Sequence, residues 1–466
     1  MGKQKVLESV EVVGLAHKGL AIGKCNTGQV VFMSDAVPGD RVDVRLVRKK
    51  KGVWTGVPIH YHKYSPFRKD PKCKHFYDCG GCKWQHFEYS EQLLHKEIIV
   101  RDALQRIAKI DVKTFLPILG APDPYFYRNK MEYSFSRLRW KTQAEIQTGR
   151  KLERAPALGF HPPGFFDKVV DIENCWLQNS HADAIRNFVR TYALENNYSF
   201  FNPQTHEGFL RNLIIRNSSI GEWMVSLVFH HDDPPKIDAI LAGLANEFDD
   251  LNSVQYVINT KKNDSLFDQK FHLYHGKDHI VEKLGKLKFR IGPKSFFQTN
   301  SKQAERLYEI AKAYCNLTGE EVLYDLYSGI GSIAMFVADQ CKAVIGIEEI
   351  EAAVQDAKIN ARLNELRNIS FYCGDVRQVL ADELFERHGH PDVIITDPPR
   401  GGMHENVVKH ISKCHPLRVV YISCNPATQA RDLAMMADQY TVDKIQPVDM
   451  FPHTSHIENV ALLIRR

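Results

Sequence analysis

From about Lys286 to its C-terminus the chain alternates apolar, strand-like runs with segments of helical spacing. This alternation is typical of a doubly wound α/β domain, in which helices cover both faces of a largely parallel sheet. The clearest unit is EVLYDLYSGIGSIAMFVA, which predicts a buried strand, a glycine turn and a helix. Gly329 and Gly331 would let a ligand approach the backbone closely, as in nucleotide-binding turns. We therefore expect a nucleotide-bearing ligand at this turn.

Acidic residues follow the next two predicted strands. Glu348 ends the run AVIGIE about twenty residues after the glycine turn, where a carboxylate accepts hydrogen bonds from ribose hydroxyls. Asp375 follows NISFYC, a position suited to an adenine amino group. A glycine turn, a ribose acid and a base-reading acid at successive strand ends favour S-adenosylmethionine, and NAD stays open from these residues alone.

Two further strand ends carry reactive or acidic side chains. Asp397 follows VIIT in a loop stiffened by two prolines, and Arg400 stands where an aromatic residue would indicate methylation of an exocyclic amine. Cys424 follows VVYIS. A cysteine beside a buried strand is usually a small core residue. At the cofactor edge of a sheet it is also a candidate nucleophile.

Methylation of uracil at C5 would need such a cysteine, because C5 is too weak a nucleophile to take up a methyl group directly. Addition of a thiolate to C6 creates an enolate whose C5 can react, and a base must then remove the C5 proton so that the thiol can leave. The C-terminal stretch FPHTSHIENV offers three bases, His453, His456 and Glu458. The sequence alone leaves the choice among them open.

Three cysteines lie within ten residues in PKCKHFYDCGGCKWQH, namely Cys73, Cys79 and Cys82. Their C-x5-C-x2-C spacing on a glycine-containing loop is typical of a metal site. Cys175 in DIENCWLQ is the best candidate for a fourth ligand. Four thiolates suit either zinc or a [4Fe–4S] cluster.

The N-terminal 62 residues alternate short apolar runs with turn signals and predict a small antiparallel barrel. They hold ten Lys/Arg against five Asp/Glu, a local excess that equals the net charge of +5 of the whole chain. A basic end indicates a polyanion partner. The run Arg48 to Lys51 is expected at the tip of a hairpin.

The middle of the chain predicts an α+β domain with a mostly antiparallel sheet and one clear helix around His181 to Asn196. YRNKMEYSFSRLRW interleaves aromatic and basic residues, as an RNA-binding strand would. Before it, residues 90–110 have helical spacing. There is neither a membrane-spanning apolar run nor a secretory signal, so we expect a cytoplasmic protein.

The ordered motifs DLYxGxG, DPPR, SCNPAT and FPHTxHxE, with SFFQTN upstream, are similar to those of the TrmA/RumA family of S-adenosylmethionine-dependent RNA 5-methyluridine methyltransferases. The N-terminal pattern G-x-A…G-x-x-V-F…A-V-P-G-D resembles the TRAM domain, an OB-like RNA-binding barrel. The resemblance covers essentially the whole chain. It implies a TRAM-like barrel over 1–62, a central RNA-binding domain with the cysteine loop over 63–290, and a Rossmann-like α/β methyltransferase domain over 291–466. The helix at 90–110 is expected to pack on this last domain.

Carried over residue by residue, the resemblance implies that Cys424 is the nucleophile and Glu458 the base. Phe296 would stack on a flipped target base. Ser328 departs from the cysteine that many relatives have in DLYCG, and the mechanism does not need that thiol. Cofactor contacts are implied for Gln298, Tyr327, Glu348 and Asp397, and we add Asp375 from its place at a strand end. Asp397 is also placed to touch the uracil.

The similarity of CGGC-x-x-Q to the family's cluster loop implies a structural [4Fe–4S] cluster on Cys73, Cys79, Cys82 and Cys175. The barrel and this loop together resemble the branch that acts on large-subunit 23S ribosomal RNA, so we expect a monomeric rRNA methyltransferase. One alternative is methylation of the thymine-loop uridine of tRNA. Another, from a different class, is an RNA-binding protein without catalytic activity.

Overall fold

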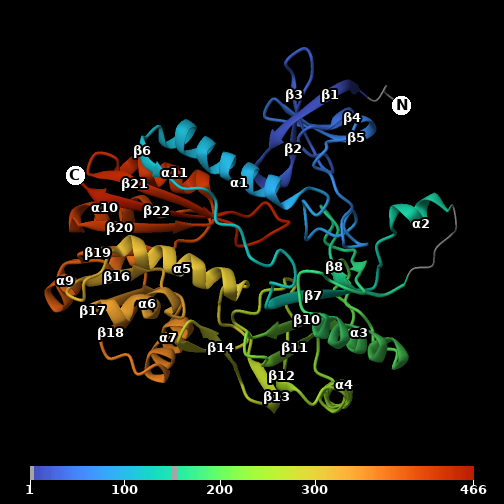
Figure 1. The fold of residues 1–466 in the computed structure, drawn as a ribbon. Coiled ribbons are helices and arrows are strands. Elements are labelled where there is room, and N and C mark those ends of the chain that lie inside the picture. Colours follow the sequence, from blue (N-terminus) through green and yellow to red (C-terminus); the bar gives the residue numbers. More distant parts are fainter. Residues whose placement is uncertain (1–4, 149–154) are drawn as a thin grey trace.

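The N-terminal part of the molecule is a closed barrel, as the sequence predicts. The computed structural model describes residues 5–148 and 155–466 (Figure 1). The barrel strands follow the order β1-β2-β3-β5-β4, and Val10, Val31 and Val42 fill the interior. β3 runs parallel to β5, so the barrel is not antiparallel throughout. The strands are β1 (Val6–Leu15), β2 (Ala21–Lys24), β3 (Val30–Met33), β4 (Arg41–Lys50) and β5 (Val53–Lys63), with a 3-10 turn at His17–Gly19.

The hairpin between β4 and β5 carries the basic run Arg48 to Lys51 at its tip, as predicted. Lys51 and Gly52 both have positive φ, 48° and 83°. Two such residues in succession form the tight turn whose twist matches that of the flanking strands. All four basic side chains are exposed. They are therefore accessible to a polyanion.

The central part is a seven-stranded sheet with two helices packed on it. Its order is β13-β12-β11-β10-β7-β8-β9, and all neighbours are antiparallel except β11 and β12. Side chains such as Ile185 and Val189 of α3 and Ile240 of α4 share one core with the sheet. The elements are β7 (Lys130–Ser136), α2 (Gln143–Gln147), β8 (Ala157–Phe160), β9 (Val170–Asp171), α3 (Ser180–Glu195), β10 (Leu210–Asn217), β11 (Trp223–Phe229), α4 (Pro234–Glu247), β12 (Leu251–Ile258) and β13 (Phe271–Gly276).

The C-terminal part is built on an eight-stranded sheet of order β18-β17-β16-β19-β20-β22-β21-β6. The first five strands of this order are parallel to one another, and β22 lies antiparallel between β20 and β21. From β16 the chain adds β17 and β18 on one side, and it then adds β19 and β20 on the other side. Ligands of doubly wound folds bind at this point, where the direction of strand addition changes. The strands are β16 (Val322–Leu326), β17 (Ala343–Glu348), β18 (Ile369–Cys373), β19 (Val393–Thr396), β20 (Arg418–Ser423), β21 (Tyr440–Val448) and β22 (Glu458–Arg465).

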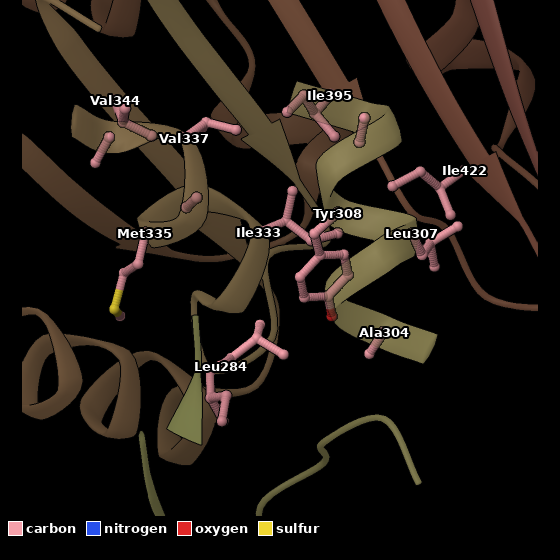
Figure 2. Packing of buried hydrophobic residues seen from close by; sticks show 14 of the residues in the cluster. Leu284, Ala304, Leu307, Tyr308, Ile333, Met335, Val337, Val344, Ile395 and Ile422 are labelled. Carbon is pink, nitrogen blue, oxygen red and sulfur yellow. The ribbon is translucent and has the colours of Figure 1, made fainter. Parts of the chain in front are cut away.

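Helices cover both faces of this sheet. On one face, α5, α6 and α7 form a continuous core with it, and Figure 2 shows Leu307, Tyr308 and Ile333 of this core beside Ile395 and Ile422 of the strands. On the other face lie α8 to α11. The helices are α5 (Ser301–Cys315), α6 (Ser332–Val337), α7 (Glu351–Leu363), α8 (Val376–Val379), α9 (Asp382–His388), α10 (Glu405–Cys414) and α11 (Pro426–Met436), with a 3-10 turn at Ala338–Gln340.

Several elements from outside the predicted methyltransferase range of 291–466 join this domain. The helix expected at 90–110 is α1 (Tyr89–Ala103), continued by a π-helical turn at Leu104–Ala108, and its buried residues share a core with α10 and α11. The following strand β6 (Val112–Phe115) pairs in parallel with β21 at the sheet edge. The hairpin of β14 (Ile280–Leu284) and β15 (Leu287–Ile291) packs into the core of α5 and α6. No helix in the described part of the chain is long and apolar enough to cross a membrane.

Candidate active site

The strand register places Cys424 opposite Glu458. In the antiparallel pair of β20 and β22, Ile422 pairs with Val460 and Ser423 with Asn459. Continued one position beyond the last pair, this register brings Cys424, which follows β20, next to Glu458, and the Glu458 charge acts on the thiol. Directly opposed residues of antiparallel strands have side chains on the same face, with Cβ atoms about 4.5–5.5 Å apart. The thiol and the carboxyl group therefore face one site although they lie far apart in the chain.

Burial and nearby carboxylate charges favour the protonated forms of the acidic groups and of the thiol at this site. Burial raises the pKa of Glu458 well above its ordinary value, and Asp397 raises it further, whereas Arg400 lowers it. Burial also raises the pKa of Asp397 to about 7. The pKa of the Cys424 thiol is raised to about 11 by burial and by the charges of Glu458 and Asp397, against the opposing effect of Arg400. Near neutral pH, the thiol is thus protonated and the two acids hold a proton between them.

The glycine turn after β16 is shaped for a ligand. Tyr327 has φ 65°, a left-handed conformation that costs about 1–3 kcal/mol in a residue other than glycine and is typical of ligand sites. At Gly331 a Cβ atom would lie 2.6 Å from Phe371 Cζ, so only glycine fits. Gly329 N donates to Glu348 Oε2 at 2.9 Å, and Ile350 N donates to Glu348 Oε1 at 2.9 Å. These bonds fix the predicted ribose acid beside the turn.

Asp325, which the sequence reasoning did not single out, belongs to the same group of acids. It is buried, and its Oδ2 accepts hydrogen bonds from Ser328 Oγ at 2.9 Å and from Ala334 N at 3.1 Å. Its Oδ1 has no hydrogen-bond partner among the described residues. Burial raises its pKa to about 7. Its place inside the motif DLYSG was the sequence signal that could have pointed to it. Ser328, where many relatives have cysteine, supplies one of the two hydrogen-bond donors to its carboxylate.

Asp375 has a strong local partner. It begins α8, where its Oδ1 accepts from Arg377 N at 2.8 Å, and both its oxygens accept from the Arg377 guanidinium. The Arg377 side chain holds the pKa of Asp375 down to about 2. An adenine amino group would have to share this carboxylate with Arg377, so the predicted cofactor contact of Asp375 stays a prediction.

The two histidines of FPHTSHIE lie in different surroundings. His453 is buried, its Nδ1 lies 3.2 Å from Gln92 Nε2 of α1, and burial lowers its pKa to about 3. His456 lies 3.0 Å from Arg400 Nη2 through its Nδ1 and lines a cavity of about 110 Å³ together with Cys424. Of these two histidines, only His456 is placed in the same cavity as the thiol.

A larger cavity of about 500 Å³ joins the cysteine loop to the predicted base-stacking residue. It is lined by all four predicted ligands, Cys73, Cys79, Cys82 and Cys175, and by Phe296. Phe296 is 70% exposed. Its segment is tied to the central domain, because Asn129 Nδ2 donates to the Gln298 carbonyl at 3.0 Å. Phe296 thus lines the cavity, and Gln298 lies in the same segment, which leads from the central domain to α5.

Basic side chains line the same cavity. Arg128 and Lys130, from the predicted RNA-binding strand, contribute to it together with Arg216 and Lys294. Arg139 from that strand segment is instead paired with Glu145 at 2.7 Å. Part of the predicted basic stripe therefore faces the cavity and part of it supports local structure.

The cysteine loop is held by hydrogen bonds to its sulfur atoms. Gln85 is buried; its Oε1 accepts from Cys73 N at 3.1 Å and its Nε2 donates to Cys82 Sγ at 3.2 Å. The pKa of the Cys79 thiol is raised to about 12 and that of Cys175 to about 11, mainly by burial and to a smaller degree by neighbouring cysteines. Within residues 5–148 and 155–466, no three His, Cys, Asp or Glu side chains form a group that could hold a metal ion. Metal binding by the four thiols therefore stays a prediction.

Comparison with known proteins agrees with this architecture. Residues 215–466 match the family described as tRNA (Uracil-5-)-methyltransferase, and residues 7–59 match the TRAM domain. An uncharacterized RNA methyltransferase of Bacteroides thetaiotaomicron is 49% identical over 452 residues, which cover 96% of this chain and 99% of the relative. Another, from Porphyromonas gingivalis, is 49% identical over 98% of this chain and 99% of its own length.

A solved structure is similar over nearly the full length. It is the Pyrococcus abyssi tRNA (uracil-54, C5)-methyltransferase in complex with S-adenosyl-L-homocysteine, with a TM-score of 0.75 and 28% identity over 98% of this chain and 100% of that one. The barrel, the methyltransferase fold and the matched relatives agree. The chain belongs to the TrmA/RumA-type family of S-adenosylmethionine-dependent RNA uracil-5-methyltransferases and carries an N-terminal TRAM domain.

Proposed function

We propose that Cys424 is the nucleophile and Glu458 the base in forming 5-methyluridine in RNA. The assignment is supported by the register of β20 and β22, whose last pair, Ser423 with Asn459, immediately precedes Cys424 and Glu458, and by the effect of the Glu458 charge on the Cys424 thiol. A nucleophile on C6 and a base for the C5 proton must reach adjacent carbons of one ring. Two side chains on one face of neighbouring strands have the right separation for that.

The acids of the site fit the cationic cofactor. Burial raises the pKa of Asp325, Asp397 and Glu458, and the charge of Asp397 contributes to the rise for the other two acids. Asp325 Oδ1 is buried without a hydrogen-bond partner among the described residues. A group carrying positive charge would relieve this accumulation of carboxylates. S-adenosylmethionine, when bound, supplies the methyl group on a positively charged sulfur. We assign Tyr327, Glu348, Asp397 and Gln298 to its binding, with Asp375 beside Arg377 as a further contact.

The protein residues would then act in sequence. The Cys424 thiol gives up its proton to solvent, the proton of the acid pair stays on Asp397, and the sulfur forms a bond to C6 of the uracil. C5 gains the methyl group while the C6–S bond holds the ring in its reactive form. The Glu458 carboxylate takes the C5 proton, the C5=C6 double bond re-forms and the thiolate leaves. We assign stacking on the extruded base to Phe296, which is exposed and lines the basic cavity.

For the cysteine loop we propose a structural [4Fe–4S] cluster. In such a cluster each of four thiolates binds a different iron, so the sulfur atoms stand apart around a shared space. The four cysteines of this chain line one cavity, and Gln85 N–H and Gly81 N–H donate to two of their sulfur atoms. These four half-buried cysteines have thiol pKa values raised by desolvation, and iron ions would stabilise them as thiolates.

For the substrate we propose 23S ribosomal RNA. The barrel and the cysteine loop suggest this branch of the family. The alternative, the thymine-loop uridine of tRNA, is favoured by the solved neighbour, which acts on tRNA and aligns with 98% of this chain. That alignment spans the barrel and the loop, so those two elements do not by themselves separate the two RNAs.

The decisive experiment uses RNA that lacks the modification. Ribosomal RNA and tRNA from a strain deleted for this gene are incubated separately with purified protein and S-adenosylmethionine, then digested and mapped by mass spectrometry. We expect 5-methyluridine at a 23S position with the wild-type protein and none with Cys424→Ala. Product confined to tRNA would overturn the rRNA assignment. Product from Cys424→Ala would overturn the assignment of the nucleophile.

A further inference from the structure

The TRAM barrel contributes a side chain to the cavity that contains the nucleophile. This cavity, of about 110 Å³, is lined by Lys18 of the barrel and by residues of the methyltransferase domain: Arg400, Cys424, Asn425, Pro426, Ser455, His456 and Ile457. Two of these are cations and none is a carboxylate. We propose that Lys18 and Arg400 bind an RNA phosphodiester next to the target uridine, so that the barrel completes the substrate site. This inference rests on the proposed uridine methylation at Cys424.

The turn that carries Lys18 has a fixed place on the methyltransferase domain. Gly19 lacks a Cβ atom at a point where one would lie 3.2 Å from the Lys83 side chain and 3.3 Å from Ser455 Cβ. The Gly19 carbonyl accepts a hydrogen bond at 3.2 Å from Nε1 of the buried Trp84. The turn therefore packs closely against the loop that leads to Glu458. Lys18 is not an ordinary surface lysine on a separate domain.

The backbone at Lys18 is in an unfavourable conformation. Its φ is 74°, in the left-handed region, and the next residue, Gly19, also has a positive φ of 80°. Ala16 and Leu20 close the turn with a backbone hydrogen bond of 2.7 Å, from Ala16 N to Leu20 O. A lysine held in such a conformation is more costly than glycine would be. Strained residues that are fixed by their surroundings occur preferentially at ligand sites.

The opposite wall of the cavity is also positive and well anchored. The Arg400 carbonyl accepts hydrogen bonds from Asn425 Nδ2 at 3.0 Å and from Thr428 Oγ1 at 3.3 Å, which tie its backbone to the start of α11. The eleven-residue helix α11 begins at this wall, with Asn425 in the capping position. The positive end of the helix dipole adds to the two side-chain cations.

The position beside Cys424 determines which anion is expected. When the Cys424 sulfur bonds to C6, the base is fixed at the thiol, and the ribose and its two phosphates must leave the site nearby. A positive cavity in direct contact with the thiol is suited to one of those phosphates. Lysine and arginine contacts to phosphates set the register of a nucleic acid without reading its sequence. Lys18 would therefore position the target nucleotide for attack.

The test compares two charge losses in the same barrel. Lys18→Ala removes the cavity lysine, and Lys24→Ala, at the exposed end of β2, removes an equal charge outside the cavity lining. Both are made in the Cys424→Ala background, where binding cannot become covalent. The probe is the hairpin RNA whose uridine the wild-type enzyme methylates in the mapping experiment. Its Kd is measured as a function of salt concentration.

We expect Lys18→Ala to weaken binding about tenfold and to lower the slope of log Kd against log salt by about one. Lys24→Ala should change both quantities much less. Replacing the phosphate 5′ or 3′ of the target with a neutral methylphosphonate should abolish the effect of Lys18→Ala at one of the two positions. Equal effects of the two variants, or no effect of either methylphosphonate, would overturn the proposal.

Kinetic measurements separate failure of the phosphate proposal from failure of the proposed function. If Lys18→Ala alone retains full kcat at saturating RNA and shows a raised KM, Lys18 binds substrate, as proposed. If kcat falls and its pH profile shifts while KM is unchanged, Lys18 acts on the thiol and the phosphate assignment is wrong. If the wild-type enzyme methylates no RNA, the proposed function itself fails.

Discussion

Lys96 Nζ lies 2.6 Å from Asp449 Oδ1, and neither side chain is exposed to solvent. The pair joins α1 to the loop that leads to Glu458, across 353 residues of sequence. Asp449 also accepts from Tyr89 OH at 2.9 Å, and Lys96 donates to the Phe451 carbonyl at 3.2 Å. An early helix thus fixes the course of the late loop that leads to the proposed base.

Breaking this pair should destabilise the protein strongly. Lys96→Met leaves Asp449 buried without its counter-charge, and removal of one partner of a buried pair costs about 3–5 kcal/mol. Urea unfolding followed by intrinsic fluorescence measures the change. The control is Lys409→Ala, whose exposed pair with Glu405 should contribute less than about 1 kcal/mol. Equal stability of Lys96→Met and wild type would contradict this role of the pair.

Glu458→Gln should stop the reaction after bond formation. The amide cannot take the C5 proton, so the methylated RNA stays attached to Cys424, and turnover falls by about 10²- to 10⁴-fold. Denaturing gel electrophoresis detects the covalent protein–RNA adduct. His456→Ala, which removes the candidate base that lines the cavity with the thiol, should show no such adduct. An adduct with His456→Ala and none with Glu458→Gln would make the histidine the base.

Cofactor affinity should rise with pH. Asp325 and Asp397 have pKa values raised to about 7, so they are largely protonated at pH 6 and ionised at pH 8. A cationic sulfonium favours the ionised carboxylates, so S-adenosylmethionine should bind more tightly at pH 8, by up to about tenfold per unit for each proton released. Calorimetry at both pH values measures this. S-adenosylhomocysteine, which lacks the sulfonium charge, should show a weaker dependence, and an equal dependence would exclude this origin.

The cysteine loop should yield iron and sulfide in anaerobically purified protein. Protein prepared in this way should be brown with about four irons per chain. Cys175→Ser should lower the iron content, because Cys175 lines the same cavity as the other three thiols. Cys25→Ser, in the barrel, serves as the control and should keep the wild-type iron content. A colourless preparation that contains zinc would contradict the cluster.

Features that depend on strand order were predictable to different degrees. Parallel strands bring their carboxyl ends to one edge, so the placement of Glu348 and Cys424 near the glycine turn followed from the alternating pattern. The position of Glu458 did not, because β22 lies antiparallel between two strands that precede it in sequence. Only the family resemblance selected Glu458 over His453 and His456 as the base. The five-stranded barrel was predictable because its turns are local, but its parallel β3–β5 pair was not.

Side-chain partners were the least predictable features. Asp375 was assigned to adenine from its strand-end position, but a strand-end pattern does not reveal that Arg377, two residues later, would turn back onto it. The position of Lys18 in the same cavity as Cys424 depends on contacts among the barrel, the cysteine loop and the C-terminal loop. Those contacts are tertiary, and no periodicity in the sequence encodes them.

The pairing of β6 with β21 has a consequence for how the protein is made. Val112 pairs with Val442, so this short strand leaves the ribosome long before its only parallel neighbour in the sheet exists. Until translation is nearly complete, α1 and β6 have no sheet to join. A fragment cut at the start of the predicted methyltransferase range would leave β21 as a bare edge, open to pairing with other chains. The catalytic part therefore cannot be excised with a single cut, because a shortened version would also have to retain α1 and β6, residues 89–115.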